Sequence, residues 1–130
     1  YQQFDYFGKV MLPGEYYRTA ISSVQRLHGK SVRFAVITDD MPLATQWFSG
    51  APIYSFDRNT DFWLLANAGM LIIPNSTFSW WAAYVNKRAQ TVIAPKRWLG
   101  YNGDTSWEPH DCETDLFSYL DKDGSITRGS

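Results

Sequence analysis

The sequence predicts an α/β fold, a Rossmann-like open parallel sheet with helices on both faces. Short β-branched and apolar runs alternate along the chain with longer segments of helical periodicity. Each run is almost continuously apolar, which is typical of a strand buried on both faces of a parallel sheet. A length of 130 residues suits one domain, so we expect a single domain over residues 1–130 with a frayed polar tail over 122–130.

The expected elements are bounded by residues typical of helix ends. A helix opens near Leu12 and runs to about Leu27, with Ile21, Val24 and Leu27 on one face, and Gly29 ends it. Residues 1–11 before it are interpreted as a loop. In chain order the sequence then predicts a strand over 32–37, a helix over 41–48, a strand over 53–56, a helix that Thr60 caps and that runs to Ala68 before Gly69, a strand over 70–73, a helix over 77–86, a strand over 91–94, a loop over 98–110 and a helical turn over 115–120.

Charge and composition exclude several classes of function. The net charge is −1 and the basic residues are scattered, so we expect no nucleic-acid partner and no anionic membrane surface as a partner. The single Cys112 excludes an internal disulfide and is interpreted as a partly buried thiol. His28 and His110 have no serine or cysteine elbow near them, and the sequence contains no glycine-rich dinucleotide motif or P-loop.

Polar residues follow each of the four predicted strands. Ligands bind at the carboxyl ends of the strands in open parallel sheets, so these segments are the candidate site. The four segments are Thr-Asp-Asp at 38–40, Asp-Arg-Asn-Thr-Asp at 57–61, Asn-Ser-Thr at 75–77 and Pro-Lys-Arg at 95–97.

The third of these turns leads from a buried strand directly into a helix. The N–H groups and the positive dipole end of that helix suit a phosphate, and the hydroxyls of Ser76 and Thr77 add further donors. The simpler interpretation is that Asn75 or Ser76 caps the helix. Both interpretations hold together, because a capped helix still presents N–H groups to an anion. Asn75 also begins a glycosylation acceptor motif, but a strand-to-helix turn makes a poorly accessible acceptor.

Three aspartates at the first two strand ends have both local and functional interpretations. Only one of Asp39 and Asp40 can face a ligand, and the alternative for the pair is a turn and a helix cap. Asp61 lies in the first turn of its helix, where a carboxylate interacts favourably with the dipole. Alternatively its carboxylate accepts the paired N1–H and N2–H of guanine. A metal role is weak, because no third ligand stands at a suitable spacing.

Two adjacent tryptophans follow the third turn. Side chains one residue apart on a helix point about 100° apart, so Trp80 and Trp81 do not share one neighbour. We expect one to pack on the sheet and the other against another element or a further domain. The alternative is that both are core aromatics.

Several motifs together resemble those of the α-1,2-fucosyltransferases, over roughly residues 5–99. The most specific is the run Asn-Ser-Thr-Phe-Ser-Trp-Trp at 75–81. The others are Leu-Pro-Gly-Glu-Tyr-Tyr at 12–17, Thr-Asp-Asp at 38–40, Asp-Phe-Trp-Leu-Leu at 61–65 and Ala-Pro-Lys-Arg-Trp at 94–98.

The resemblance implies the donor-binding half of a GT-B glycosyltransferase that uses GDP-fucose. In that family pattern Asp61 holds guanine, Asn75 belongs to the donor-binding turn, and Asp40 shapes the donor pocket. Ser76, Thr77 and Phe78 meet the diphosphate. Transfer inverts the anomeric centre, and no cofactor or metal is expected. The partners are a nucleotide-sugar donor and a glycan acceptor, and a family member lies in the cytoplasm of a bacterium, which we favour, or in the Golgi lumen of a eukaryote.

The sequence departs from the family at its beginning. Gln2 and Gln3 stand where the family has the two arginines of a His-x-Arg-Arg-x-Asp motif, and Asp5 fits its end. Asp5 is the candidate catalytic base, with Glu15 a distant second. We therefore expect a domain truncated at its first strand. The alternatives are a non-catalytic nucleotide-sugar-binding or interaction fragment that forms a homodimer through an exposed sheet edge, and a receiver-like signalling domain that fits only loosely.

Overall fold

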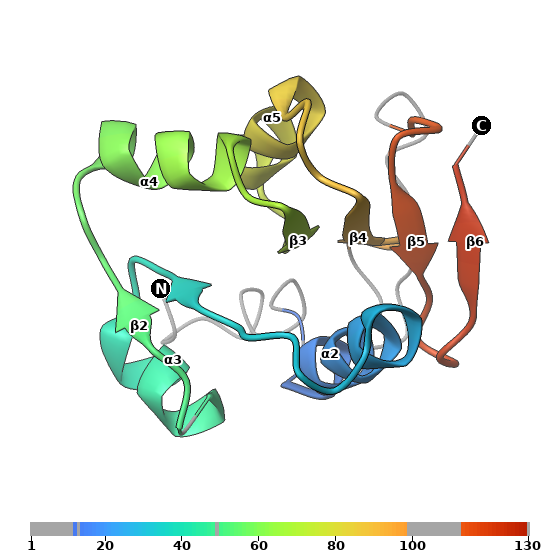
Figure 1. The fold of residues 1–130 in the computed structure, drawn as a ribbon, viewed down its shortest axis with the longest axis horizontal. Helices are drawn as coiled ribbons and strands as arrows, with labels where there is room; N and C mark the ends of the chain where they lie inside the picture. The colour runs from blue at the N-terminus through green and yellow to red at the C-terminus, as the bar shows by residue number, and fades with distance from the viewer. Residues whose placement is uncertain (1–11, 13, 49, 99–112, 130) are drawn as a thin grey trace.

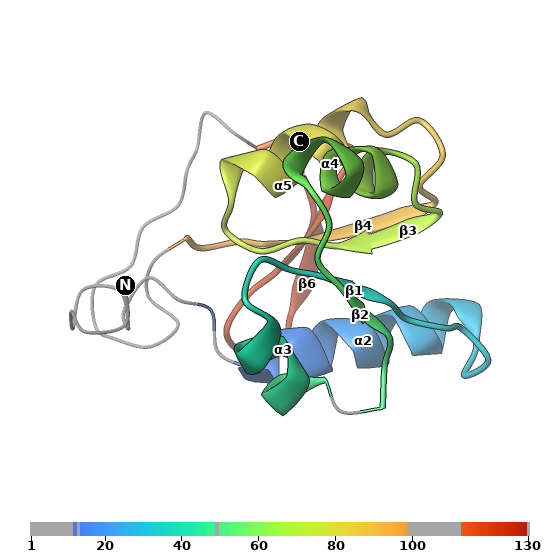
Figure 2. The same ribbon diagram turned by 90° about the vertical axis from the view of Figure 1, so that its left-hand side faces the viewer.

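The computed structural model describes residues 12, 14–48, 50–98 and 113–129, and these form an α/β arrangement (Figure 1). Figure 2 shows α2 and α3 on one side of the strands and α4 and α5 on the other. Among these residues no helix is long and apolar enough to cross a membrane. The elements are α2 (Gly14–His28), β1 (Val36–Ile37), α3 (Met41–Trp47), β2 (Ile53–Tyr54), α4 (Arg58–Ala66), β3 (Met70–Ile72), α5 (Thr77–Val85), β4 (Thr91–Pro95), β5 (Ser118–Leu120) and β6 (Ile126–Arg128).

The strands form two sheets. In the larger sheet the order is β3-β4-β5-β6, and β3, β4 and β5 are parallel while β6 runs antiparallel to β5. In the smaller sheet β1 pairs with β2 in parallel. The α/β class, the parallel pairing and the helices on both faces are confirmed. The expectation of one continuous parallel sheet is wrong for the described residues, because no pairing joins β1 or β2 to β3 and because the edge strand β6 is antiparallel.

The larger sheet separates two apolar cores, because successive side chains of a strand point to opposite faces. Leu71 of β3 and Val92 of β4 belong to the core under α5, whereas Ile93 of β4 belongs to the core over α2. The α5-side core also contains Ile73, Ala83, Ala94, Phe117 and Tyr119. The α2-side core also contains Leu12, Tyr16, Ala20, Val24 and Leu120. The apolar runs at 70–73 and 91–94 therefore do mark strands that are covered on both faces, whereas β1 and β2 contain no buried residue.

Helix α2 matches its prediction in length but not in its buried face. Tyr16, Ala20 and Val24 recur every four residues and are buried, while Leu27 is 67% exposed. Leu27 lies in the last turn, beside this stripe. Gly29 ends the helix as expected, with φ of +96° and its N–H donating to the carbonyl oxygen of Gln25 at 2.8 Å.

Two element boundaries differ from their predictions for local reasons. Asp57, not Thr60, caps α4, because its Oδ1 accepts a hydrogen bond from the Thr60 backbone N–H at 2.6 Å. The helix therefore begins at Arg58, and it ends at Ala66 with Asn67 as its C-cap. Strands β1 and β2 are shorter than expected, each with two paired residues.

Helices α4 and α5 are joined at their carboxyl ends by Asn86. Its Nδ2 donates to the carbonyl oxygens of Leu65 and Ala68 at 2.9 and 3.0 Å. Its Oδ1 accepts from the backbone N–H groups of Arg88 and Ala89 at 2.7 and 2.8 Å. The Asn86 side chain thus donates hydrogen bonds to two carbonyl oxygens at the end of α4, and it also stabilises the turn that follows α5.

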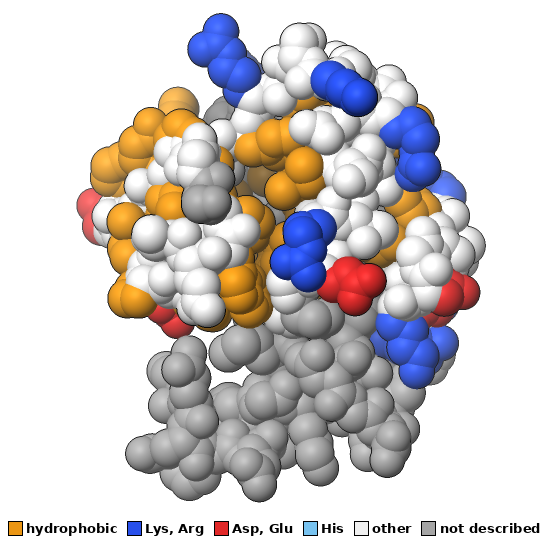
Figure 3. Space-filling view, turned by 90° about the horizontal axis from the view of Figure 1, so that it is seen from below, with side chains coloured by type: hydrophobic (Ala, Val, Ile, Leu, Met, Phe, Trp, Pro, Cys, Tyr) orange, Lys and Arg blue, Asp and Glu red, His pale blue; other side chains and the backbone are white. Residues whose placement is uncertain are grey.

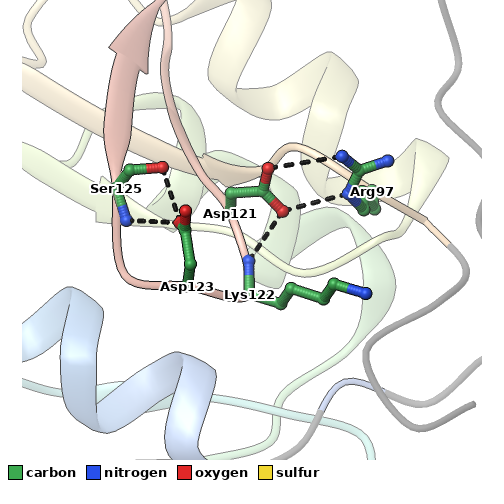
Figure 4. A network of polar contacts seen from close by, with 5 residues as sticks. All are labelled: Arg97, Asp121, Lys122, Asp123 and Ser125. Atoms are coloured by element: carbon green, nitrogen blue, oxygen red, sulfur yellow. Dashed lines mark hydrogen bonds and ion pairs between the residues drawn. The ribbon is translucent and has the colours of Figure 1, made fainter.

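The C-terminal segment forms a hairpin, not the expected helical turn over 115–120 and frayed tail over 122–130. Phe117 is fully buried and Leu120 nearly so, which places β5 in the sheet beside β4. Strand β6 then pairs with β5 through a turn in which Gly124 has φ of +88°. Asp123 stabilises this turn, because its Oδ1 accepts from the backbone N–H and the hydroxyl of Ser125 at 2.9 and 2.6 Å (Figure 4). Each of these strands has only three residues, too few to show a clear periodicity, so the sequence did not reveal them.

Candidate functional site

The turn between β3 and α5 is the best-defined candidate site. Ser76 is the N-cap of α5, with extended backbone angles and with its Oγ accepting from the Ser79 backbone N–H at 3.3 Å. The helix begins at Thr77, so the first-turn N–H groups point out of the helix end toward the turn. The capping interpretation of Ser76 is confirmed, and the geometry remains suited to an anion.

Asn75 ties this turn to the end of the neighbouring strand. Its Nδ2 donates to the backbone oxygen of Trp98 at 3.0 Å, across 23 residues of sequence. Asn75 therefore joins the segment after β3 to the segment after β4. Its expected contact with the nucleotide-sugar donor stays a prediction. In the structure the Asn75 side chain orders the turn.

Phe78 connects the start of α5 to the start of α4. Its ring lies edge-on to that of Phe62, with the centroids 5.5 Å apart, and the Arg58 guanidinium carbon lies 5.5 Å from the Phe78 centroid. Thr77, by contrast, is exposed. Arg58 belongs to one of the polar segments that follow the strands, but no sequence pattern indicated a role for it. Its proximity to Phe78 places a permanent positive charge beside the candidate anion site.

Asp61 orders the turn between β2 and α4. Its half-buried carboxylate accepts from the Phe56 backbone N–H at 3.1 Å through Oδ1. The exposed rings of Tyr54 and Phe56 are stacked beside it, with centroids 5.6 Å apart and planes 13° from parallel. A carboxylate next to an exposed aromatic pair suits a planar base with donor groups on its edge.

Asp40 occupies a separate turn, in the smaller sheet. It is the N-cap of α3, where its Oδ1 accepts from the Leu43 N–H at 3.1 Å. Its own N–H donates to Thr38 Oγ1 at 2.9 Å. The turn-and-cap alternative is therefore confirmed for Asp40, while Asp39 is exposed. The ring contact between Phe62 and Phe78 brings the second and third strand ends together, and no comparable contact among the described residues joins Asp40 to them.

The fourth strand end has a structural pairing. Arg97 Nε lies 3.0 Å from Asp121 Oδ1, and a second guanidinium nitrogen lies 3.4 Å from Oδ2 (Figure 4). Oδ1 of Asp121 also accepts from the Lys122 backbone N–H at 2.7 Å. This two-point ion pair holds Arg97, the second residue after β4, to the β5–β6 turn, so the Arg97 side chain already has a partner within the fold.

The two tryptophans differ in burial as expected, but the expectation that they share no neighbour is wrong, because the Tyr84 ring is stacked on Trp80 with centroids 4.9 Å apart and lies edge-on to Trp81. Trp80 packs against the α5-side core and lies edge-on to Phe117, with centroids 5.9 Å apart. Trp81 is 55% exposed and contacts Trp80 and Tyr84. The alternative that both are core aromatics is wrong.

The pKa is shifted at Tyr17 of α2 and at two aspartates in turns, Asp57 and Asp123, and hydrogen bonds from Ser125 lower the pKa of Asp123. Burial raises the pKa of the Tyr17 hydroxyl to about 12. Hydrogen bonds from the Thr60 side chain and backbone lower the pKa of Asp57, which keeps this capping carboxylate charged. Within the described ranges no three His, Cys, Asp or Glu side chains are grouped so as to hold a metal ion. Asp5, Gln2, Gln3, His110 and Cys112 lie outside the described residues.

Comparisons with known proteins agree on one family. The profile of glycosyl transferase family 11 matches residues 9–108. The O-antigen biosynthesis glycosyltransferase WbnK of Escherichia coli is 32% identical over 100 residues, which are 71% of this chain and 33% of that protein. The alpha-1,2-colitosyltransferase of Escherichia coli is 35% identical over 85 residues, 58% of this chain and 29% of that protein. No solved structure matches the chain significantly. The chain spans about a third of the length of the curated relatives it matches.

Proposed function

Because the chain belongs to glycosyl transferase family 11, we propose that it is the donor-binding half of an α-1,2-fucosyltransferase-like enzyme of the GT-B type. The donor is GDP-fucose, and the complete protein transfers fucose to a glycan acceptor. The two relatives come from Escherichia coli, which supports a bacterial source and a cytoplasmic setting. The family match covers residues 9–108, a range that contains Asp40, Asp61 and residues 75–78.

The observation that carries the proposal is the capped start of α5. Ser76 caps the helix, and Asn75 donates a hydrogen bond from the turn to the segment after β4. The Arg58 guanidinium lies over the Phe78 ring. Helix N–H groups and a nearby arginine are the donors that a diphosphate requires. We propose that the diphosphate lies at Ser76, Thr77 and Phe78.

The guanine base extends toward α4. The Asp61 carboxylate accepts from its N1–H and N2–H groups, and the exposed rings of Tyr54 and Phe56 offer an apolar surface beside it. Asp61 already accepts one backbone hydrogen bond, from Phe56, which orients the carboxylate before the base arrives. Asp40 shapes the donor pocket from its position at the start of α3.

The reaction is an inverting displacement without a metal or other cofactor. The acceptor hydroxyl attacks the anomeric carbon of fucose, the bond to the diphosphate oxygen breaks, and GDP leaves with the negative charge. Donors at the start of α5 stabilise that charge as it develops. Asp5 is proposed as the base that takes the proton of the acceptor hydroxyl.

Calorimetric titration of the chain with GDP-fucose, GDP and UDP-glucose tests the donor proposal. We expect GDP-fucose and GDP to bind and UDP-glucose to bind far more weakly. Asp61→Asn keeps an oxygen for the Phe56 N–H but loses the charge, so GDP affinity should fall about ten- to a hundredfold. Asp39→Asn, at an exposed aspartate of the next turn, is the matched control. The absence of any response to millimolar GDP and GDP-fucose contradicts the proposal.

The donor sugar needs its own comparison. One relative is named as a colitosyltransferase, so GDP-linked colitose is the competing donor. Equal affinity for the GDP-linked forms of both sugars would locate sugar discrimination outside residues 1–130.

A second candidate function is a non-catalytic nucleotide-sugar-binding or interaction fragment. It is favoured by the outer edge of β3, which pairs with no strand of the described residues and so invites a homodimer. Sedimentation at high protein concentration distinguishes the two candidates. A dimer that binds GDP without any transfer in the complete protein supports the second, and a monomer argues against the homodimer.

A further inference from the structure

Helices α4 and α5 expose large aromatic side chains on the side that faces away from the sheet. Trp63 of α4 is 63% exposed and Trp81 of α5 is 55% exposed. Each stands two residues before a side chain that packs on the α5-side core, Leu65 in α4 and Ala83 in α5. Two residues span about 200° of a helix, so both indoles point away from the core. Figure 2 shows the two helices together on one side of the strands.

Tyr84 and Val85 extend this surface along α5, and both are exposed. Val85 follows Trp81 by about one helical turn, and the Trp81 and Tyr84 rings lie edge-on with centroids 5.9 Å apart. Tyr84 is also stacked on Trp80, which packs against the core, so the ring is held in place at the surface. We call Trp63, Trp81, Tyr84 and Val85 the outer face.

The outer face adjoins two cations. Lys87 and Arg88 are exposed in the turn directly after α5, and within the described part of the chain neither side chain forms an ion pair. No Asp or Glu occurs between residues 62 and 98. The acidic residues of α4 and its cap, Asp57 and Asp61, lie at the start of that helix, away from the carboxyl ends that Asn86 joins. The carboxyl end of the outer face is therefore positive.

The two cations also have a local explanation, because positive side chains interact favourably with the carboxyl ends of helices. That explanation leaves the exposed rings unaccounted for. Apolar side chains scattered singly on a surface are ordinary, but a contiguous apolar patch marks an interaction site. The outer face is such a patch on α5, where Trp81, Tyr84 and Val85 follow one another.

Area and charge decide between the possible occupants. A stable contact between two protein copies buries about 800 Å² on each partner, and four partly exposed side chains supply only a fraction of that. On a membrane, by contrast, tryptophan and tyrosine rings lie at the level of the headgroups, and adjacent lysine and arginine attract anionic lipids. Figure 3 shows the opposite side of the molecule, where hydrophobic side chains gather over α3 and β2 while basic and acidic side chains are intermixed.

We propose that the outer face is a peripheral contact site for an anionic phospholipid bilayer. The rings enter the headgroup region, and Lys87 and Arg88 contact lipid phosphates. The sequence analysis expected no such partner because the net charge is −1 and the basic residues are scattered along the chain, but the fold places these two cations beside the exposed rings. The turns of Asp61 and Ser76 lie at the other ends of the two helices. The proposal does not depend on which nucleotide sugar binds.

Vesicle sedimentation tests the proposal without any nucleotide. The chain is mixed with vesicles of phosphatidylcholine alone and with vesicles of phosphatidylcholine and phosphatidylglycerol. We expect binding to the mixed vesicles to be about tenfold or more tighter, and to weaken as the salt concentration rises. Equal binding to both vesicles, or binding to neither at millimolar lipid, overturns the proposal.

An aromatic double variant tests the ring contact. Trp81→Gln with Tyr84→Gln should weaken binding to the mixed vesicles about tenfold or more, because the rings no longer enter the headgroup region. Leu27→Gln, at an exposed apolar residue of α2 on the other side of the strands, is the matched control and should bind like the native chain. Equal binding by the two variants contradicts the proposal. If sedimentation without lipid instead shows a dimer that the double variant abolishes, the outer face binds a second copy and the proposal is wrong.

A charge-reversal pair gives a second readout that does not disturb the aromatic cluster. Lys87→Glu with Arg88→Glu should abolish the preference for the mixed vesicles. Lys30→Glu with Arg33→Glu changes the net charge by the same amount at exposed residues between α2 and β1, and should keep most of that preference. Thermal denaturation confirms that each variant is folded. An equal loss in both variants would show that only the overall charge matters, which also contradicts the proposal.

Discussion

The Tyr16 hydroxyl donates a hydrogen bond to the carbonyl oxygen of Ile73 at 2.7 Å, and this links α2 to the residue at which β3 leads into the Ser76 turn. The same hydroxyl lies 3.4 Å from the carbonyl oxygen of Ile93 in β4. Tyr16 is buried, so the bond is shielded from water. A helix on one face of the sheet thus sets the position of the turn that begins α5 on the other.

Replacing Tyr16 by phenylalanine should destabilise the fold and weaken the site together. The carbonyl oxygen of Ile73 loses a buried donor, which costs about 1–3 kcal/mol in the free energy of unfolding. Urea denaturation measures this loss, and GDP affinity should fall with it. Tyr84→Phe, at an exposed tyrosine of α5, is the control and should change neither quantity.

Stability should decline at alkaline pH because of Tyr17. Burial raises the pKa of the Tyr17 hydroxyl from its ordinary value of 10.0 to about 12 in the folded protein, so folding favours the protonated form. This contribution is fully present below pH 10 and is lost as the pH rises from about 10 to 12, at up to about 1.4 kcal/mol per pH unit. Urea denaturation near pH 9 and pH 11 should show a smaller decline for Tyr17→Phe than for the native chain. Equal declines would show that burial of this hydroxyl does not govern the effect.

The ion pair between Arg97 and Asp121 should contribute measurably to stability. The two side chains are 25% and 17% exposed and make a two-point contact, which places the pair between surface and buried ion pairs. Asp121→Asn should therefore cost about 1–2 kcal/mol, or a few degrees in Tm. Asp123→Asn changes an exposed aspartate of the same turn and should cost less. A Tm equal to that of the native chain for Asp121→Asn would show that the pair is fully offset by desolvation.

Ser76 allows capping and anion binding to be separated. Asparagine and aspartate both cap helices, so Ser76→Asn and Ser76→Asp should keep Tm close to that of the native chain. Only the aspartate places a negative charge at the proposed diphosphate position, so its GDP affinity should fall more than about tenfold below that of the asparagine variant. Calorimetry on the two variants makes the comparison. Equal affinities would place the diphosphate elsewhere.

The sequence predicted some local features of the fold and missed others. The start of α5 was predictable, because a capping residue follows an apolar strand directly. The cap of α4 was missed because Asp57 and Thr60 are both suitable and stand three residues apart. The hairpin of β5 and β6 was missed because each strand has three residues and β6 is exposed on its whole length.

Contacts between residues that are far apart in the sequence could not be predicted from local sequence patterns. Arg97 and Asp121 are 24 residues apart, and the proximity of Arg58 to Phe78 follows from the packing of two helices. The residues of the candidate site were identified by their motifs, whereas their arrangement was not. The described hydrogen bonds of Asp40, for example, lie within its own turn. The contacts that bring other site residues together join α4, the helix of Asp61, to Phe78.

Asn86 and the ring pair of Phe62 and Phe78 join α4 and α5 at two points, the first at the carboxyl ends of both helices and the second between the start of α5 and the middle of α4. Two helices joined at two points do not shift independently. A displacement of the first turn of α5 therefore also moves α4, the helix that contains Asp61. A molecule that binds at the first turn of α5 will therefore also affect the turn of Asp61, and the reverse holds too, without any change in the sheet beneath the two helices.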